Sequence, residues 1–236
     1  MLVKPGFCWH GPAAFQSFAM TARFQRRLVR HHLPLALLCL ASGWLLYATR
    51  PYTDVITKLS FATAYPALFL LCLTLAFGPF KQLMGQRLAT SHDLRRDIGI
   101  WAGILGLLHT GLGQFVHLRG RPWLYYIHED WQAKGYAQPL RTDLFGFNND
   151  TGLLAALLLL MLAATSNDAS LRRLGTPGWK KLQRWNYACF ALTAAHTFGY
   201  QSGGGRGGFL IASIAAVAAT LLLQGIGWQQ RRAQAA

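Results

Sequence analysis

The stretch DIGIWAGILGLLHTGLGQFVHL, which runs from Asp97 to Leu118, decides how this chain folds. It is apolar enough to span a bilayer, yet it carries His109 in its interior. An ionisable residue at membrane depth is costly and by default marks a functional site. At about 100° per residue, four glycines share roughly one third of the helix surface with this histidine: Gly99, Gly103, Gly106 and Gly113. A nitrogen ligand beside a groove without side chains predicts a site for a flat macrocycle such as haem.

A second histidine, His196, lies inside another apolar stretch, WNYACFALTAAHTFGY. With a rise of about 1.5 Å per residue, His109 lies roughly 18 Å beyond Asp97, and His196 roughly 21 Å beyond Leu182. Two imidazoles at one level on two helices are expected to bind one iron from opposite sides. That is the ligation of a bis-histidine b-type haem, which favours electron transfer over oxygen binding. The alternative is that each histidine is only hydrogen-bonded to a neighbouring helix.

Apolar composition places the chain in a membrane. Charged residues make up 13% of the sequence, against about 25% in soluble proteins. Six apolar stretches approach the roughly 20 residues that a spanning helix needs: Leu33–Thr49, Leu59–Phe77, Ile98–Leu118, Thr151–Thr165, Trp185–Tyr200 and Phe209–Trp228. The sequence therefore predicts an all-α integral membrane protein, a bundle of six transmembrane helices. Gly78-Pro79 is expected to end the second span, and the leucine-rich fourth span is expected to face lipid.

The distribution of the cations predicts the orientation of this bundle. If the N-terminus lies inside, the four inner segments carry five, four, five and two of the 23 lysines and arginines, and the three outer segments carry two, four and one. The positive-inside rule then places both termini in the cytoplasm. The net charge of +15 is thus explained by topology and by contact with anionic membrane lipid, and no nucleic-acid partner is expected.

The domain boundaries follow from this topology. Residues 1–32 are predicted to form an N-terminal cytoplasmic segment, residues 33–228 the six-helix domain, and residues 229–236 a short cytoplasmic tail. A basic run follows Met20, so the start site is either Met1 or Met20. No C-x-x-C-H motif occurs, which argues against covalently attached c-type haem.

Other polar residues have less specific interpretations. His31 and His32 are adjacent at the membrane edge and are expected to point in different directions, toward solvent. His117 is rotated by about 80° from His109 on a helix, so it is interpreted as an alternative ligand or an outer gate. Arg206, in a glycine-rich outer turn, is a candidate partner for a haem propionate.

The link between the fourth and fifth spans carries a family resemblance. It has the form T-S-N-x(6)-L-G-x(3)-W-K-x-L-x-R-x-x-Y, from Thr165 to Tyr187. With six spans and one histidine in each of the third and fifth, residues 33–228 resemble the ferric reductase-like transmembrane domain. In size the chain is similar to the haem-binding membrane subunit of the periplasmic methionine sulfoxide reductase system. The resemblance implies that His109 and His196 are the outer haem pair.

The resemblance also implies an inner haem pair, which this chain lacks. At the matching positions it has Arg95 or Arg96 and Gln183, so one haem b is predicted. A flavin or a quinone would then substitute for the inner haem. The expected function is electron transfer across a bacterial inner membrane, from a cytoplasmic flavin reductase or quinol to a periplasmic redox partner. The alternatives are reduction of a metal chelate such as ferric iron at the outer face, and a non-redox assembly or transport protein with structural histidines.

Overall fold

The computed structural model describes residues 22–85, 93–118, 120–202 and 207–235. These residues form helices, and no strand is present among them. A helical stretch from Ala22 contains one π-helical turn, η1 (Leu28–His32), before it continues as α2. The remaining elements are α2 (Leu33–Thr49), α3 (Val55–Met84), α4 (Leu94–Gly113), η3 (Pro122–Tyr125), α5 (Leu144–Ala164), α6 (Asp168–Gln183), α7 (Asn186–Gln201) and α8 (Gly207–Ala235).

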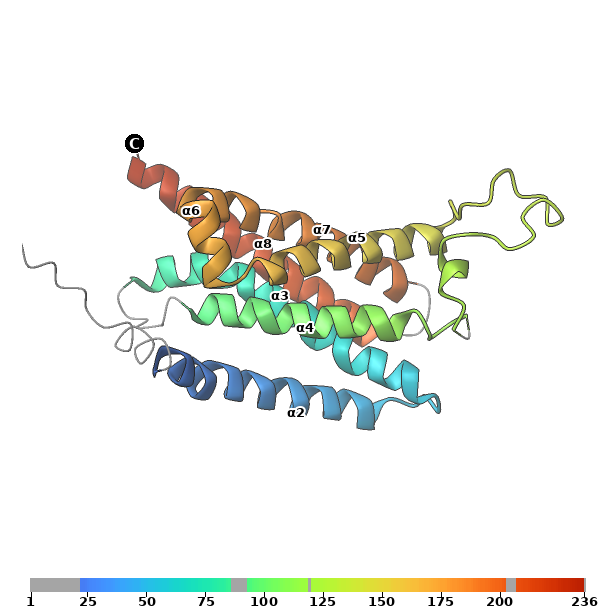
Figure 1. Cartoon of the computed structure of the whole chain (residues 1–236), viewed down its shortest axis with the longest axis horizontal. Helices are drawn as coiled ribbons and strands as arrows, with labels where there is room; N and C mark the ends of the chain where they lie inside the picture. Colours follow the sequence, from blue (N-terminus) through green and yellow to red (C-terminus); the bar gives the residue numbers. More distant parts are fainter. Residues whose placement is uncertain (1–21, 86–92, 119, 203–206, 236) are drawn as a thin grey trace, which may run out of the picture.

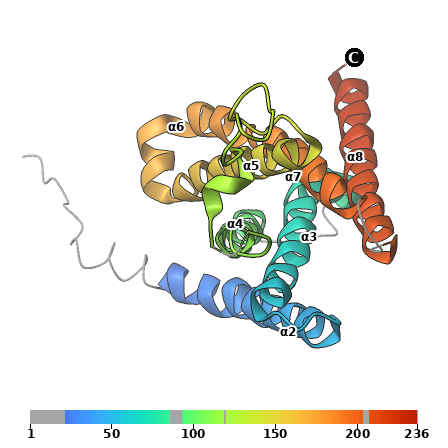
Figure 2. The same cartoon turned by 90° about the vertical axis from the view of Figure 1, so that its right-hand side faces the viewer.

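The bundle runs lengthwise along α2, α3, α4, α5, α7 and α8, as Figure 1 shows. Helix α3 is central, because it packs against α2, α4 and α8. Helix α5 packs against α7 and α4, and the end-on view places α4 between the α2–α3 pair and α5 (Figure 2). The long loop that contains η3 lies at one end of the bundle, and α6 lies at the other. This arrangement brings the two histidine-bearing helices, α4 and α7, into the interior.

Four helices in the described part of the chain are long and apolar enough to cross a membrane: Ala22–Thr49, Val55–Met84, Leu144–Ala164 and Gly207–Gln234. The two histidine-bearing helices are not among them. Helix α7 has only 16 residues, and α4 begins with Arg95, Arg96 and Asp97. That α4 and α7 also cross the membrane, and that both termini are cytoplasmic, stays a prediction.

Two predicted helix ends are wrong. Helix α4 ends at Gly113 instead of continuing to Leu118, and the chain then turns back through His117. Helix α3 does not end at Gly78-Pro79 but continues to Met84. Proline lacks only the N–H that would bond the previous turn, and Pro79 is buried, with its ring opposite Gly227 of α8.

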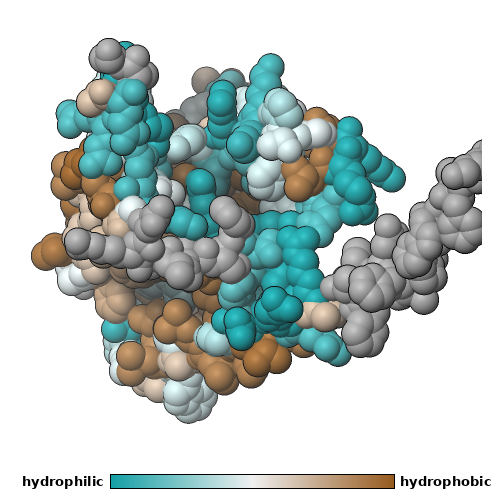
Figure 3. All heavy atoms as spheres, turned by 90° about the vertical axis from the view of Figure 1, so that its left-hand side faces the viewer, coloured by the Kyte–Doolittle hydropathy of each residue, from teal (hydrophilic) through white to brown (hydrophobic). Residues whose placement is uncertain are grey.

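The described helices sort their apolar side chains into an interior set and an outer set. The buried core is formed mainly by α3, α4 and α7 around residues such as Leu75, Ala102 and Cys189. Leucines of α2 and α8, such as Leu40 and Leu222, are exposed. In water such exposure would favour aggregation, and in a bilayer it provides the lipid-facing surface. Hydrophilic side chains gather over the end of the bundle that carries α6, with hydrophobic ones at its flanks (Figure 3).

The end that carries α6 is called the inner end below, and the end with the long loop is called the outer end. Helix α6 is amphipathic and contains a break at Gly175, where φ is +63°. The two cations near its end, Lys180 and Lys181, lie at this end of the bundle, which the predicted topology places in the cytoplasm.

Candidate functional site

A cavity of about 400 Å³ lies between α3, α4, α5 and α7. Its volume is within the usual range of ligand pockets. Along α4 the lining residues extend from Ala102 through His109 to His117. His196 of α7 lines the same cavity. The structure therefore brings together the two histidines that the sequence singled out.

The ring centres of His109 and His196 are 6.2 Å apart, and the ring planes are inclined at 69°. An imidazole nitrogen lies about 2.0 Å from a bound transition metal and about 1.1 Å from its own ring centre, so two imidazoles on opposite sides of one metal ion have centres about 6.2 Å apart. The observed separation is therefore compatible with one metal ion between the two rings.

Hydrogen bonds fix which nitrogen of each ring faces the cavity. Nδ1 of His109 lies 3.1 Å from the carbonyl oxygen of Ser60. Nδ1 of His196 lies 2.7 Å from the carbonyl oxygen of Asn148. A carbonyl oxygen only accepts, so each Nδ1 carries the hydrogen and donates it. Each Nε2 then keeps its lone pair for a metal, which is the arrangement that orients metal-bound histidines in proteins.

Helices α5 and α7 approach closely at this level because each has a glycine opposite a polar side chain of the other. A Cβ atom on Gly152 of α5 would lie 2.5 Å from Nδ1 of His196. A Cβ atom on Gly199 of α7 would overlap the side-chain amide of Asn148. The predicted lipid-facing fourth span holds for one face of α5, where Leu154, Leu157 and Leu160 are exposed, and the other face supplies one wall of the cavity. Sequence reasoning missed Gly152, and its only signal was a glycine at the start of an otherwise plain leucine-alanine run.

The predicted glycine groove on α4 is divided between two roles. Gly106 and Gly113 line the cavity. Gly103 is not among the lining residues, and the surface of α4 at Gly103 lies against Ala163 of α5. Gly99 faces Thr74 of α3. Gly99 and Gly103 thus allow helices to pack. A Cβ on Gly106 would lie 2.7 Å from the Leu159 side chain, and only one on Gly113 would meet open space.

Arg206 lies outside the described residues, as do Met1 and Met20. Among the described residues, no group of three or more histidine, cysteine or acidic side chains is placed to hold a bare metal ion. Two histidines suffice for an iron whose other four ligands come from a macrocycle. The residues present therefore fit haem, which His109 and His196 would hold.

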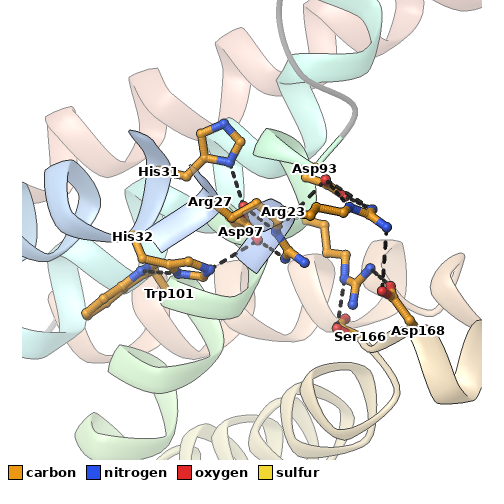
Figure 4. Close-up of polar contacts among 10 residues, drawn as sticks. Arg23, Arg27, His31, His32, Asp93, Asp97, Trp101, Ser166 and Asp168 are labelled. Atoms are coloured by element: carbon orange, nitrogen blue, oxygen red, sulfur yellow. Dashed lines mark hydrogen bonds and ion pairs between the residues drawn. The ribbon is translucent and has the colours of Figure 1, made fainter. Parts of the chain in front are cut away.

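A second concentration of polar side chains lies at the inner end, around Asp97 (Figure 4). The Asp97 carboxylate is fully buried. It pairs with the Arg27 guanidinium and with Nδ1 of His31, the latter at 2.6 Å. Nε2 of His32 lies 3.5 Å from the same carboxylate, and Trp101 donates its indole N–H to Nδ1 of His32 at 3.2 Å. These five residues form the inner polar cluster.

The solvent-facing interpretation of His31 and His32 is wrong. Both are the last residues of the π-helical turn η1, and the exposed fractions of their side chains are only 11% and 22%. A π-turn is wider than an α-turn, so the two adjacent side chains both reach Asp97. These contacts connect the residues just before α2 to the first turn of α4.

Arg96 and Gln183, which stand where the family resemblance implies an inner pair of haem ligands, make other contacts. Arg96 donates to the carbonyl oxygen of Ser166 at 2.8 Å and pairs with Asp168 at 2.6 Å. The Arg96 guanidinium holds the pKa of the Asp168 carboxyl below its ordinary value. Gln183 lies 3.4 Å from the hydroxyl of Thr165. Both side chains are thus engaged with the turn between α5 and α6.

Comparison with known proteins identifies the family. The ferric reductase-like transmembrane component family matches residues 57–194, a range that includes His109 and ends just before His196. The chain belongs to the ferric reductase-like transmembrane family. This confirms the resemblance that the link between the fourth and fifth spans carries.

Individual relatives are similar over parts of the chain. A protein-methionine-sulfoxide reductase haem-binding subunit MsrQ from Ralstonia nicotianae is 32% identical over 71% of this chain and 69% of its own length. The protein of the same name from Deinococcus radiodurans is 33% identical over 57% of this chain, and the match spans 58% of that relative. The magnetosome protein MamZ from Magnetospirillum gryphiswaldense is 28% identical over 53% of this chain and 17% of its own. No solved structure matches the chain.

Proposed function

We propose that this chain is a b-type haem protein that passes electrons across a bacterial inner membrane. His109 and His196 ligate a single haem, and the carbonyl groups of Ser60 and Asn148 hold their imidazoles in the metal-binding tautomer. The haem supplies a one-electron centre, and the protein sets its position and surroundings. The observation that carries this proposal is the 6.2 Å separation of the two ring centres within one cavity.

Membership of the family supports the redox role. Two relatives are named as haem-binding subunits of a methionine-sulfoxide reductase. By analogy, the outer acceptor is a periplasmic redox protein of that kind. The donor is a cytoplasmic flavin reductase or a membrane quinol, with a flavin or quinone bridging the inner half of the bundle.

Two features of the inner end support electron entry there. The inner end carries exposed cations of α6, including Arg172 and Arg173, which suit an anionic donor surface. The cavity extends inward along α4 to Ala102, about 10 Å from the level of His109 at 1.5 Å per residue. The edge of a haem that fills this space would therefore lie nearer to a donor at the inner end than His109 and His196 do.

Reduction of a ferric chelate at the outer face is the second candidate, favoured by the family to which the chain belongs. A test that separates the two uses purified protein in vesicles. Either a flavin reductase with NADH or a reduced quinol analogue is added, and haem reduction is followed by absorbance. Reoxidation is then compared between a periplasmic methionine sulfoxide reductase and a ferric chelate.

Reoxidation by the protein acceptor alone supports the proposal, and reoxidation by the chelate alone supports the second candidate. A haem that neither donor reduces contradicts the proposed electron source. A protein that binds no haem contradicts both candidates and leaves a non-redox membrane protein with structural histidines.

A further inference from the structure

The two ends of the cavity differ in chemistry. Toward the inner end it is lined by aliphatic side chains, including Leu68, Leu71 and Leu159. Toward the outer end the lining includes Phe61 and Val116 but also five polar side chains: Gln114, His117, Asn149, Tyr200 and Gln201. The change occurs at the level of His109 and His196. A ligand that spans the cavity therefore meets an apolar environment at one edge and hydrogen-bonding groups at the other.

One outer polar group has hydrogen-bonding capacity that the described residues do not use. Gln201 is 6% exposed, and its Nε2 lies 3.1 Å from Ser213 Oγ and 3.3 Å from the Tyr65 hydroxyl. Its Oε1 is buried without a partner among the described residues. The oxygen and nitrogen of a glutamine side-chain amide have nearly the same shape, so which of them faces a given partner is decided by the hydrogen bonds. With the amide turned, both hydroxyls donate to Oε1, and the NH₂ group is left to donate to a ligand.

Among the residues that line the outer half of the cavity, His117 is the one whose side chain can carry a positive charge. Its ring centre lies 6.1 Å from that of Tyr200, with the planes 9° apart. Its main-chain N–H donates to the Tyr125 hydroxyl, which in turn donates to the Gly113 carbonyl oxygen, both at 2.9 Å. Tyr125 is 1% exposed. The end of α4 and the buried tyrosine thus fix where His117 lies.

Haem b has the matching asymmetry. Two propionate carboxylates lie on one edge of the macrocycle, and methyl and vinyl groups lie on the opposite edge. Burying an unpaired carboxylate among aliphatic side chains is strongly unfavourable. We infer that haem enters this cavity with its propionates toward the outer end, and that His117 is the cationic partner of one propionate. This inference rests on the proposed haem function, and it adds the orientation of the ligand and the residue that sets it.

The test compares two haems in the same protein. Apoprotein in detergent is loaded with protohaem or with its dimethyl ester, which has no carboxylates. The rate of haem loss and the midpoint potential are then measured for wild type, His117→Asn and His117→Lys. Arg50→Gln is the matched control, because Arg50 is an outer cation that stacks on Phe209, 4.1 Å from its ring centre, and is not among the lining residues.

With protohaem, His117→Asn is expected to lose haem about tenfold faster, as for one charge-assisted hydrogen bond, and to have a lower midpoint potential. His117→Lys restores both properties. With the dimethyl ester, wild type and His117→Asn behave alike. Arg50→Gln stays close to wild type with either haem.

Equal effects of His117→Asn with both haems would overturn the inference, because His117 would then act through packing. No effect with either haem would overturn it as well. Both results leave the proposed haem function standing. A wild-type protein that binds neither haem contradicts the proposed function itself.

Discussion

The carbonyl oxygen of Asn148 accepts a hydrogen bond from Nδ1 of His196 at 2.7 Å, across 48 positions of sequence. Gly152, one turn further along α5, leaves room for the same imidazole. One turn of α5 therefore both orients the ring and accommodates it. The position of the His196 imidazole therefore depends on α5, a helix that carries neither of the two histidines.

Replacing Gly152 by alanine tests this dependence. The new Cβ would lie 2.5 Å from Nδ1 and 2.7 Å from Cε1 of His196, so the ring must move. Changes in groups that orient a metal-bound histidine typically weaken metal binding about 10- to 100-fold, and a similar loss of haem affinity is expected. Haem titration of the apoprotein measures it.

The matched control is Gly111→Ala on α4, where a Cβ meets nothing within 4 Å. It should leave haem affinity unchanged and, if anything, stabilise the helix by up to about 1 kcal/mol. Equal haem affinity in Gly152→Ala and wild type would show that His196 is not held as described.

Removing the charge of Asp97 should destabilise the protein strongly. The Asp97→Asn variant leaves Arg27 and two histidines without their carboxylate. Breaking a buried ion pair from one side costs about 3–5 kcal/mol. Thermal unfolding in detergent, followed by circular dichroism, should show a large fall in midpoint. Glu129→Gln, which removes an exposed pair with Arg121, is the control and should change little. Similar midpoints for the two variants would contradict the structural role of the inner polar cluster.

The pair between Arg96 and Asp168 should stabilise the protein in a pH-dependent way. The pKa of the Asp168 carboxyl is lowered from its ordinary value of 3.8 by the Arg96 guanidinium, so the folded state favours the charged carboxylate. The stabilisation is present above pH 3.8 and is lost as the pH falls through the lowered pKa. The pair is partly exposed, so at neutral pH Asp168→Asn should cost at most about 1 kcal/mol. Unfolding midpoints of the two proteins should differ at neutral pH and converge as the pH falls below 3.8. A difference that persists or grows on acidification would contradict this role.

Much of the fold follows from apolar periodicity and charge. The first predicted span, Leu33–Thr49, coincides with α2, and the other five overlap α3, α4, α5, α7 and α8. The helix ends were less predictable. Pro79 continues a helix because packing against α8 compensates for the lost hydrogen bond, and no local pattern reveals a partner about 150 positions away.

The two histidines of the candidate site could be singled out from the sequence, but the groups that support them could not. His109 and His196 are conspicuous because an imidazole inside an apolar run is rare. Gly152 and the Asn148 carbonyl are not conspicuous, since a backbone oxygen has no sequence signature and α5 reads as plain leucine and alanine. His31 and His32 were misread because an α-helical period was assumed where the chain forms a π-turn.

The central claim is that His109 and His196 hold one b-type haem. A dithionite-reduced minus oxidised absorption spectrum of the purified protein tests it, beside His109→Ala, His196→Ala and His128→Ala. His128 stacks on Tyr136 in the outer loop and does not line the cavity, so it controls for the loss of a histidine. The account predicts a b-type spectrum with one haem per chain in wild type and His128→Ala, and its loss in both other variants. A full haem signal that survives in either His109→Ala or His196→Ala would contradict the paired ligation.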